Sequence, residues 1–562
     1  MLVVRFGEPI YPVLTPIDRV ERGGPDKPWH ILINADNYHA LQLLLYSHER
    51  KIDLIYIDPP YNTGARDWKY NNDYVDRSDI WRHSKWLSMM KKRLLLAKRL
   101  LKPDGVLVIA IDDNEARHLG TLLDELLPEF DATAITVVHN PRGNITNNFA
   151  RTHEYAVFLI PKNKSLVVRT VKENVAPRKL RRWGHNSTRT ARPTMFYPIY
   201  IKDGRPIRVG EPPKASFHPA AKNILLETGE LEIWPIDQNG IERRWNFGLD
   251  AIEDEFDRIV ALKDENGSVD LFLSEEETVP KTVWSEKRFE AGKYGASLVK
   301  EIVQRPFPYP KSVYTVQQCL DMVLRTRDHA VILDFFAGSG TTLHATVLLN
   351  LEYPGNRQCI LVTNNEVEEK QSRALQKRRI YPGDPEYEAE GICGSVTWPR
   401  CKYVIQGHRD DGSALPGKYL SGRELKDGFH ENIEYFRLDF VDPALVERGD
   451  AFEGILPILW LIAGAIGERE SRRGTTPWYM ASHSPFAVLI RETKFNEFRE
   501  ALRERRDITC LFLVTDSDDN FAAMRRDLGR RYRCVQLYKT YLENFCINTV
   551  DRRTAGHDEE SE

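Results

Sequence analysis

The sequence predicts an α/β protein built on a doubly wound, mostly parallel seven-stranded sheet with an antiparallel edge hairpin. Two apolar runs, residues 52–57 and 330–333, are typical of buried strands, and each runs directly into a loop rich in proline or glycine. Strand and helix patterns alternate around these runs, as in parallel strands joined by crossover helices. Open sheets of this class bind ligands at the carboxyl ends of their strands. We therefore expect the functional site at these two loops.

The first half of the sheet is expected within residues 1–160. Apolar residues recur at helical spacing between strand-like runs, and Pro103 and Gly105 favour a turn after the longest helix. Strands are expected at 30–34, 53–57, 105–111, 134–139 and 155–160, the last two as the hairpin, and helices at 38–48 and 86–101.

An insertion separates this half from the second. After Pro161 the chain becomes rich in proline, glycine and polar residues, so residues 161–300 are expected to form an inserted α+β domain. The α/β pattern returns within residues 301–425, and residues 426–562 are expected to form a small C-terminal α/β domain. Helices are expected at 312–325 and 341–349, and strands at 330–333, 359–363, 487–490 and 510–514.

Composition limits the class of protein. A chain of 562 residues is too long for one core, and 41% hydrophobic with 29% charged residues is ordinary for a globular protein. The net charge of −3 does not indicate nucleic-acid binding. If DNA is the partner, the 79 basic residues must be unevenly distributed.

Cysteine usage and hydropathy indicate a cytoplasmic protein. Seven scattered cysteines without a C-x-x-C pair argue against zinc knuckles and fit a reducing compartment. The N-terminal residues lack signal-peptide architecture. The longest apolar stretch, 454–467, is too short for a membrane span and is expected to be a buried helix. No metal site is predicted, because the acidic run at 515–519 is better interpreted as a helix N-cap and loop.

The loop after residues 330–333 has small residues suited to a nucleoside cofactor. Its glycines permit a tight turn and close approach of a ligand, although G-x-G alone is more often a simple strand-to-helix turn. A nucleoside triphosphate loop needs a lysine after Gly340, and none is there. Glu366 follows the next strand, 26 residues after Gly340, where an acid can bind ribose hydroxyls. The loop reads Asp334-Phe335-Phe336-Ala337-Gly338-Ser339-Gly340-Thr341-Thr342.

The loop after residues 52–57, Asp58-Pro59-Pro60-Tyr61, suits a base with an exocyclic amine. Such an amine is a poor nucleophile because its lone pair is delocalised into the ring. Asp58 and the carbonyl of Pro59 can accept both amine protons and draw the nitrogen toward tetrahedral geometry. The two prolines stiffen the backbone and offer no competing N–H, and Tyr61 presents a face on which an extruded base can stack. The alternative interpretation is a rigid turn with an exposed tyrosine.

Together the two loops resemble those of DNA methyltransferases that modify exocyclic amines. The catalytic motif precedes the cofactor motif by about 275 residues, which resembles the β group, and in particular the modification subunits of type III restriction systems. The resemblance extends over about residues 28–405. Further matching stretches lie at 67–74, 111–115, 140–143 and 153–155.

The resemblance implies S-adenosyl-L-methionine as cofactor and direct transfer of its methyl group. In the family the leading acid, here Asp334, holds the methionine ammonium, and Pro308 and Lys311 lie in a segment packed near the methionine end. Asp36 resembles the acid that reaches the adenine ring, although it is also a good helix N-cap. The cofactor residues that the resemblance implies are Asp36, Pro308, Lys311, Asp334, Phe336, Ala337, Gly338, Ser339, Gly340, Thr341, Thr342 and Glu366.

The first residue of the catalytic motif bears on the acceptor. Family members that methylate cytosine amines usually have serine there, and those that act on protein glutamine usually have asparagine. Asp58 therefore favours adenine N6, with cytosine N4 as the alternative. A non-catalytic DNA-binding or partner-binding subunit that retains the fold is a further alternative, and the intact motifs argue against it.

The region between the motifs is expected to read double-stranded DNA. It contains a run of basic residues with no acid until Asp203, which can neutralise phosphates, and Trp183 could stack at an opened base pair. A solvated loop is the alternative. The DNA-contact candidates are Arg178, Lys179, Arg181, Arg182, Trp183, Arg189 and Arg192, together with Arg142, Asn144 and Asn147 in an earlier loop.

Partners follow from the resemblance alone. It implies a restriction-modification or other anti-phage defence system, in which a helicase–nuclease restriction subunit would be the partner. Residues 426–562 leave three roles open, namely homodimerisation, DNA contact, and docking of that subunit.

Overall fold

The structure is a computed structural model, and two compact units divide it. One unit is formed by Met1–Val168 together with Lys281–Glu562, and the other by Arg169–Pro280. No helix of the described chain has the length and apolar character that a membrane crossing requires. The structure describes residues 11–70, 73–76, 78–143, 148–171, 178–263, 267–273, 277–441, 452–472 and 476–537.

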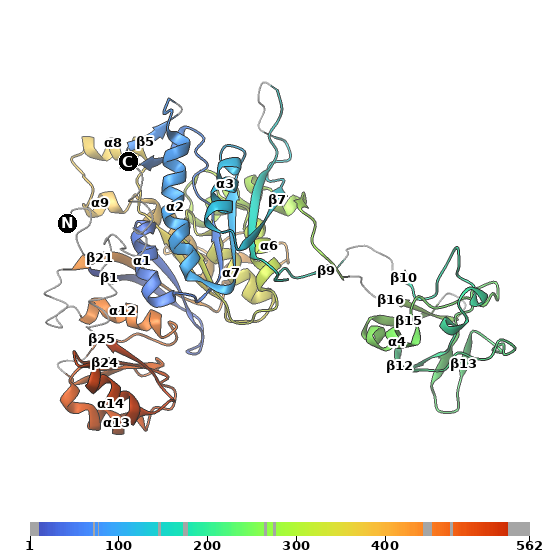
Figure 1. Ribbon diagram of the computed structural model, residues 1–562. Helices are drawn as coiled ribbons and strands as arrows, with labels where there is room; N and C mark the ends of the chain where they lie inside the picture. The colour runs from blue at the N-terminus through green and yellow to red at the C-terminus, as the bar shows by residue number, and fades with distance from the viewer. Residues whose placement is uncertain are drawn as a thin grey trace, which may run out of the picture. The chain divides into compact units, whose positions relative to one another are not determined.

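A mixed sheet of ten strands forms the centre of the first unit, in the order β1-β21-β2-β20-β19-β3-β6-β8-β7-β18 (Figure 1). The five strands from β2 to β6 in this order are parallel, and β8 and β7 continue the sheet as an antiparallel hairpin. The strands are β1 Tyr11–Glu21, β2 Trp29–Asn34, β3 Ile52–Ile57, β6 Leu101–Ile111, β7 Phe130–Val137, β8 Glu154–Pro161, β18 Val283–Trp284, β19 Val331–Asp334, β20 Gln358–Thr363 and β21 Asn432–Val441.

The expected count of seven strands is corrected to ten. The seven expected strands are present and adjacent, but β21 and β1 extend the sheet beyond β2, and β18 pairs outside β7. The hairpin is therefore not the edge of the sheet. Two of these three strands had no clear pattern, because β18 has only two residues and β1 alternates polar and apolar residues over only part of its length.

Helices cover both faces of this sheet, so it is doubly wound. The strands alternate their side chains between two cores: Ile55 and Ile57 of β3 belong to one, and Leu54 and Tyr56 to the other. On the first face lie α1 Asn37–His48, α2 Arg82–Leu100, α3 Ala116–Leu126 and α12 Phe452–Ile462. On the second face lie α5 Leu298–Val303, α6 Val313–Leu324, α7 Thr341–Glu352 and α10 Trp398–Gln406.

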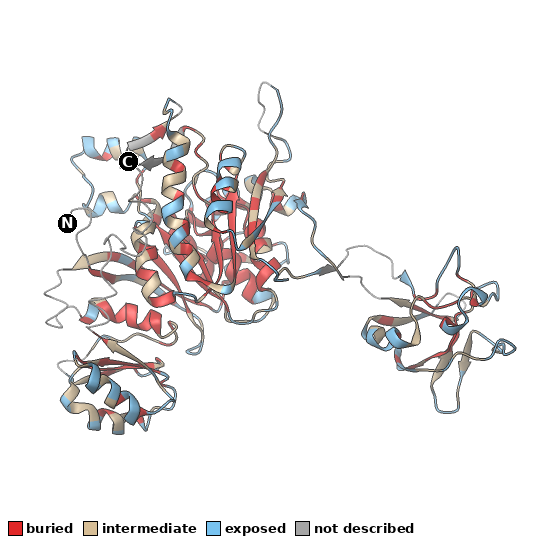
Figure 2. Ribbon diagram, viewed as in Figure 1, coloured by how far each residue is buried: buried red, intermediate tan, exposed pale blue. Residues whose placement is uncertain are grey.

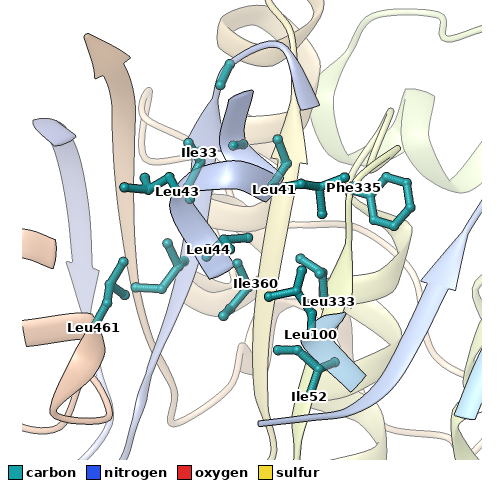
Figure 3. Close-up of a cluster of buried hydrophobic side chains, with 14 of the residues drawn as sticks. Ile33, Leu41, Leu43, Leu44, Ile52, Leu100, Leu333, Phe335, Ile360 and Leu461 are labelled. Carbon is teal, nitrogen blue, oxygen red and sulfur yellow. The ribbon is translucent and has the colours of Figure 1, made fainter. Parts of the chain in front are cut away.

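Packing under α1 shows how the first core is filled. Leu41 and Leu44 lie beside Ile33 of β2 and Ile360 of β20 (Figure 3), and all four side chains are fully buried. Burial of a leucine side chain contributes about 2 kcal/mol. Figure 2 shows that buried residues gather along the central strands, while the outer surfaces of the helices are exposed.

Shorter elements of the first unit surround the sheet. An antiparallel pair follows β3, and two short helices follow β20. They are β4 Ala65–Tyr70, β5 Asp73–Asp76, α8 Glu369–Lys377 and α9 Pro385–Glu388, with π-helical turns at Gly292–Ser297 and Cys393–Thr397.

The C-terminal residues share the core of the first unit. β21 is a strand of the central sheet, α12 is the helix expected at 454–467, and Trp460 of α12 packs edge-on against Trp29 of β2 at 5.9 Å. A separate four-stranded sheet follows, in the order β22-β23-β24-β25. Its elements are β22 Trp478–Met480, β23 Phe486–Leu489, α13 Phe495–Leu502, β24 Cys510–Val514, α14 Asp518–Leu528 and β25 Arg533–Leu537.

The second unit is a small α+β domain with its own core. Two antiparallel sheets enclose Tyr197, Trp245 and Leu271, which are fully buried. Its elements are β9 Thr170–Val171, β10 Arg178–Lys179, β11 Ile199–Lys202, β12 Arg205–Val209, β13 Asn223–Leu225, β14 Leu231–Ile233, α4 Leu249–Ile252, β15 Ile259–Lys263, β16 Val269–Leu273 and β17 Glu277–Thr278.

Candidate active site

The two predicted loops leave neighbouring strands at the same edge of the sheet. β19 pairs in parallel with β3, with Leu333 opposite Ile55. From this point β3 connects through α2 to β6 on one side, and β19 connects through α7 to β20 on the other. Since α2 and α7 cover opposite faces, a topological switch point lies between the two loops, and open α/β sheets bind ligands at such points.

Backbone geometry explains both glycines of the cofactor loop. Gly338 and Gly340 have φ of +48° and +77°, in the left-handed region that favours glycine. A Cβ on Gly340 would also lie 2.9 Å from Sγ of Cys401. The hydroxyl of Thr397 donates to the carbonyl of Gly338 and ties the turn to the start of α10.

Asp334 is a buried carboxylate at the head of this loop. Its Oδ1 accepts the N–H of Phe336 at 3.0 Å, and its Oδ2 accepts the hydroxyl of Thr342. Burial raises the pKa of Asp334 to about 7, and the nearby charge of Asp58 acts in the same direction. A cation bound beside Asp334 would offset this cost, so the carboxylate is suited to an ammonium group.

Arg400 holds the cofactor loop from the interior of the protein. No sequence pattern had indicated this role. Its side chain is fully buried, and Nη1 donates to Oγ of Ser339 at 2.8 Å and to Oγ1 of Thr341 at 2.7 Å. Burial lowers the pKa of Arg400 to about 10. These bonds turn two residues predicted for cofactor binding toward the interior, where they fix the start of α7.

Asp58 and Lys311 form the centre of the catalytic loop. Nζ of Lys311 lies 3.1 Å from Oδ1 of Asp58 and 3.1 Å from Oε2 of Glu154, and 4.5 Å from the ring centroid of Tyr61. The hydroxyl of Tyr61 donates to the same Oε2 of Glu154 at 3.0 Å. Four functional groups from three separate segments are therefore joined at the end of β3.

Burial and charge act in opposite directions on this cluster. Burial raises the pKa of Asp58, while Lys311 acts to lower it. For Lys311 burial disfavours the charged form, but the two carboxylates outweigh it and raise the pKa of the ammonium group above its ordinary value. Lys311 therefore stays protonated and stabilises the ionised form of Asp58.

The two proline carbonyls of the motif have different environments. The indole N–H of Trp86 donates to the carbonyl of Pro60 at 2.7 Å. For the carbonyl of Pro59, no donor is found within the part of the chain that the structure describes. The acceptor pair predicted for the amine, Asp58 and the Pro59 carbonyl, is thus consistent with the geometry of the loop.

The other predicted cofactor residues lie around the same edge. Asp36 accepts the N–H of Tyr38 at 2.9 Å as the N-cap of α1, and Asn37 donates to the carbonyl of Phe335 at 2.8 Å, so this cap adjoins the cofactor loop. Glu366 follows β20 and is half-buried. Pro308 is exposed, whereas Lys311, in the same segment, is 8% exposed and lies at Asp58. A cofactor contact for each of these residues stays a prediction.

Glu154 is the main functional candidate that the sequence did not single out. It lies at the start of β8, is 5% exposed, and holds both Lys311 and Tyr61. Its only signal was its place in the stretch 153–155 that contributed to the family resemblance.

The DNA-contact candidates fall into two groups. Arg181 and Arg189 are buried, at 2.7 Å from Asp270 and 2.9 Å from Glu242, so these two stabilise the second unit and do not belong to its basic surface. Asn144 and Asn147 lie outside the described residues. The exposed candidates are Arg142 in the first unit and Arg178, Lys179, Arg182, Trp183 and Arg192 in the second.

Comparisons with known proteins agree with the site. The chain is 32% identical over 350 residues to the type II methyltransferase M.KpnI of Klebsiella pneumoniae, covering 59% of this chain and 79% of that one. It is 28% identical over 394 residues to the type III restriction-modification enzyme EcoPI Mod subunit of Escherichia phage P1, covering 61% and 59%. The chain thus spans about three fifths of that Mod subunit's length.

A solved structure and a family model complete the comparison. The M1.HpyAVI–SAM complex matches 62% of this chain and 98% of its own, at 15% identity and a TM-score of 0.28, which is too weak to carry an argument. The family model described as DNA methylase matches residues 52–362, more than half of the chain and both loops. This chain belongs to the DNA methylase family.

Proposed function

We propose that the protein transfers a methyl group from S-adenosyl-L-methionine to N6 of an adenine in double-stranded DNA, as a site-specific methyltransferase. The observation that carries the proposal is the junction of the two loops at β3 and β19, where Asp58 lies close enough for its charge to act on Asp334. The family membership and the name of M.KpnI support the reaction class.

The residues at and around the cofactor loop provide groups for each part of S-adenosylmethionine. The carboxylate of Asp334 binds the methionine ammonium, and the glycine turn at Gly338 and Gly340 lets the backbone approach the ligand. Glu366 binds the ribose hydroxyls and Asp36 lies toward the adenine ring. When bound, S-adenosylmethionine supplies an electrophilic methyl group.

The catalytic half activates the acceptor. An adenine turned out of the helix stacks on Tyr61, and its amine donates one proton to Asp58 and the other to the carbonyl of Pro59. A nitrogen–carbon bond forms as the sulfur–carbon bond breaks. The extra proton on the nitrogen then passes to Asp58 and on to solvent. Lys311 keeps Asp58 ionised until that step.

Aspartate at the first position of the motif supports adenine over cytosine, as the family resemblance implies. The direct experiment is incubation with methyl-labelled S-adenosylmethionine and DNA of mixed sequence, followed by nucleoside analysis. We expect label in N6-methyladenine. Label only in N4-methylcytosine would show that the acceptor is cytosine N4 and not adenine N6. Label only in 5-methylcytosine or in protein would refute the proposal.

Asp58→Ala separates the roles of the two loops. The variant is expected to lose methyl transfer and to retain cofactor binding, because the cofactor groups belong to other segments. Loss of both activities would mean that the catalytic loop has been assigned the wrong role.

We further propose that the exposed basic residues of the second unit bind the DNA, with Arg142 of the first unit contributing.

The name of the EcoPI Mod subunit supports a place in a restriction-modification system. We therefore propose that a helicase–nuclease subunit associates with the chain, and that the chain acts in the cytoplasm, where DNA is available. Homodimerisation is the second assembly to test, by light scattering on the purified protein with and without DNA.

A further inference from the structure

Asn62 follows the catalytic tetrapeptide directly and has an unusual backbone conformation. Its φ is +54°, in the left-handed region that asparagine tolerates better than most residues, and its side chain is fully buried. The amide Nδ2 donates to Oε1 of Glu115 at 2.5 Å and to the carbonyl of Arg82 at 3.2 Å. The residue after Tyr61 is therefore fixed to elements outside the loop.

Glu115 is the centre of this attachment. It is fully buried at the entry to α3, and its Oε1 also faces Nδ1 of His83 at 2.5 Å. Nδ1 of His118 lies 3.0 Å from Oε2, although Oε2 has no well-formed hydrogen bond within the described chain. The two imidazole rings lie 4.5 Å apart, and both are partly exposed whereas the carboxylate is not.

The start of α2 holds the loop at a second point. Arg82 and His83 begin this helix, and Trp86, one turn later, donates to the carbonyl of Pro60. The catalytic loop is thus attached on both sides of Tyr61, through Pro60 to α2 and through Asn62 to both α2 and α3.

We propose that Glu115, held by His83 and His118, is a positioning residue that fixes the shape of the catalytic loop through Asn62. This inference rests on the proposed methyl transfer. In-line transfer depends on accurate placement of the amine by Asp58 and the Pro59 carbonyl, and these groups are four and three residues before Asn62. Release of Asn62 lets the loop relax and slows transfer, whereas the cofactor groups, on other segments, are unaffected.

His83, Glu115 and His118 also have the side-chain types of a metal site, with ligand atoms within 4.8 Å of one another. Two observations favour the hydrogen-bonded arrangement. Nε of Arg82 donates to Nε2 of His83 at 3.2 Å, which places the imidazole proton on Nδ1, toward Glu115. A metal ion would need the lone pair at that Nδ1, and it would lie close to the guanidinium charge.

The test exchanges donor and acceptor between the two partners. Asn62→Asp keeps a residue type that tolerates positive φ but puts two carboxylates against each other, and single-turnover methyl transfer is expected to fall by about 100-fold. Adding Glu115→Gln places an amide donor opposite the new carboxylate, and the rate of methyl transfer is expected to rise at least about tenfold above that of Asn62→Asp. A double-mutant cycle measures this gain as the coupling between the two positions. Binding of S-adenosylmethionine stays within about twofold in both variants.

A matched control is Asp124→Asn, an acid-to-amide change at an exposed position of α3, which should leave the rate unchanged. If Asn62→Asp fails to fold, His83→Gln serves in its place, with an expected loss of about tenfold and unchanged cofactor binding. Full activity of the single variants, or a double variant no faster than Asn62→Asp, would overturn the inference.

Treatment with EDTA tests the metal alternative. We expect the rate of the wild-type protein to be unchanged, and a loss that added Zn²⁺ restores would also overturn the inference. Failure of the proposed function is distinct from these outcomes, since in that case the wild-type protein itself transfers no methyl group to DNA.

Discussion

At the scale of single residues, the active site is a cluster of charges that depend on each other. The half-buried carboxylate of Asp58 and the buried carboxylate of Glu154 share the ammonium of Lys311, and Tyr61 donates to Glu154. A third carboxylate, Asp334, lies close enough for the charge of Asp58 to affect it. Burial and neighbouring charges shift the pKa values of Asp58, Lys311 and Asp334, so pH is the natural variable with which to examine them.

Replacing Lys311 with methionine is expected to move the pH profile of methyl transfer. Asp58 must be ionised to accept the amine proton, and without Lys311 burial raises its pKa further, because the largest opposing charge is gone. Activity should then be lost at a higher pH on the acid side. The buried carboxylate of Glu154, left without its cation, should cost about 3 kcal/mol of unfolding free energy. The measurements are single-turnover rates from pH 5 to 9 and urea unfolding. An acid limb at the wild-type position would contradict the assigned role.

Asp334 predicts a pH dependence of cofactor binding. Its pKa in the free protein is about 7, above the ordinary value, so the carboxylate is ionised above pH 7 and protonated below it. Only the ionised form pairs with an ammonium group. The Kd for S-adenosylmethionine should therefore be higher, by up to about tenfold, at pH 6 than at pH 8. Calorimetry at both values measures this, with Asp334→Asn as the variant that should lose the dependence. Equal affinity at both pH values would count against the assignment.

At the scale of elements, adjacent parallel strands bring the two loops together. The strands β3 and β19 and the helices after them were predictable because their apolar residues repeat with clear periods. Each motif alone could be a simple turn, and both were predictable because each follows an apolar strand and the pair resembles one family. Glu154, Glu115 and Arg400 were not, because a buried polar residue is recognised only when its partners, distant in the sequence, are known.

The turn before α7 gives a prediction with an internal control. Gly340→Ala adds a methyl group 2.9 Å from Sγ of Cys401 at a φ of +77°, so we expect a loss of more than about 2 kcal/mol in stability together with weaker cofactor binding. Gly412→Ala has the same kind of backbone, with φ of +81° and no atom within 4 Å of the new Cβ. The Gly412→Ala variant should lose only about 1 kcal/mol of unfolding free energy and bind the cofactor normally. Calorimetric melting and titration compare them, and equal effects would show that the contact with Cys401 is unimportant.

At the scale of the whole molecule, the catalytic and cofactor loops and the surface proposed to bind DNA belong to different compact units. Both loops belong to the first unit, and the exposed basic run belongs to the second, whose core is independent. The change in composition predicted an insertion at residues 161–300, and the second compact unit comprises Arg169–Pro280. The sequence did not predict that residues 432–441 complete the central sheet, because the sequence of a strand does not show which sheet it joins.

Two neighbouring arginines of the second unit should behave differently. Arg182→Ala removes an exposed charge, so DNA affinity should fall and the salt dependence should lose about one unit of slope, with stability unchanged. Arg181→Ala removes the buried partner of Asp270 and should cost about 2 kcal/mol of stability. Fluorescence anisotropy at several salt concentrations and thermal melting separate the two effects. A stability loss in Arg182→Ala, or none in Arg181→Ala, would reverse our division of the basic run.

The pairing of β21 with β1 and β2 also sets the order in which the protein can be completed during synthesis. β2 has β20 on one side and β21 on the other, and β1 pairs with β21. Both neighbours of β2 are synthesised long after it, and the second emerges only when the ribosome has passed residue 441. Until then the nascent chain carries a strand with an unpaired edge, which is a site for unwanted association. Efficient production of this protein therefore depends on how that edge is protected while the rest of the chain is made.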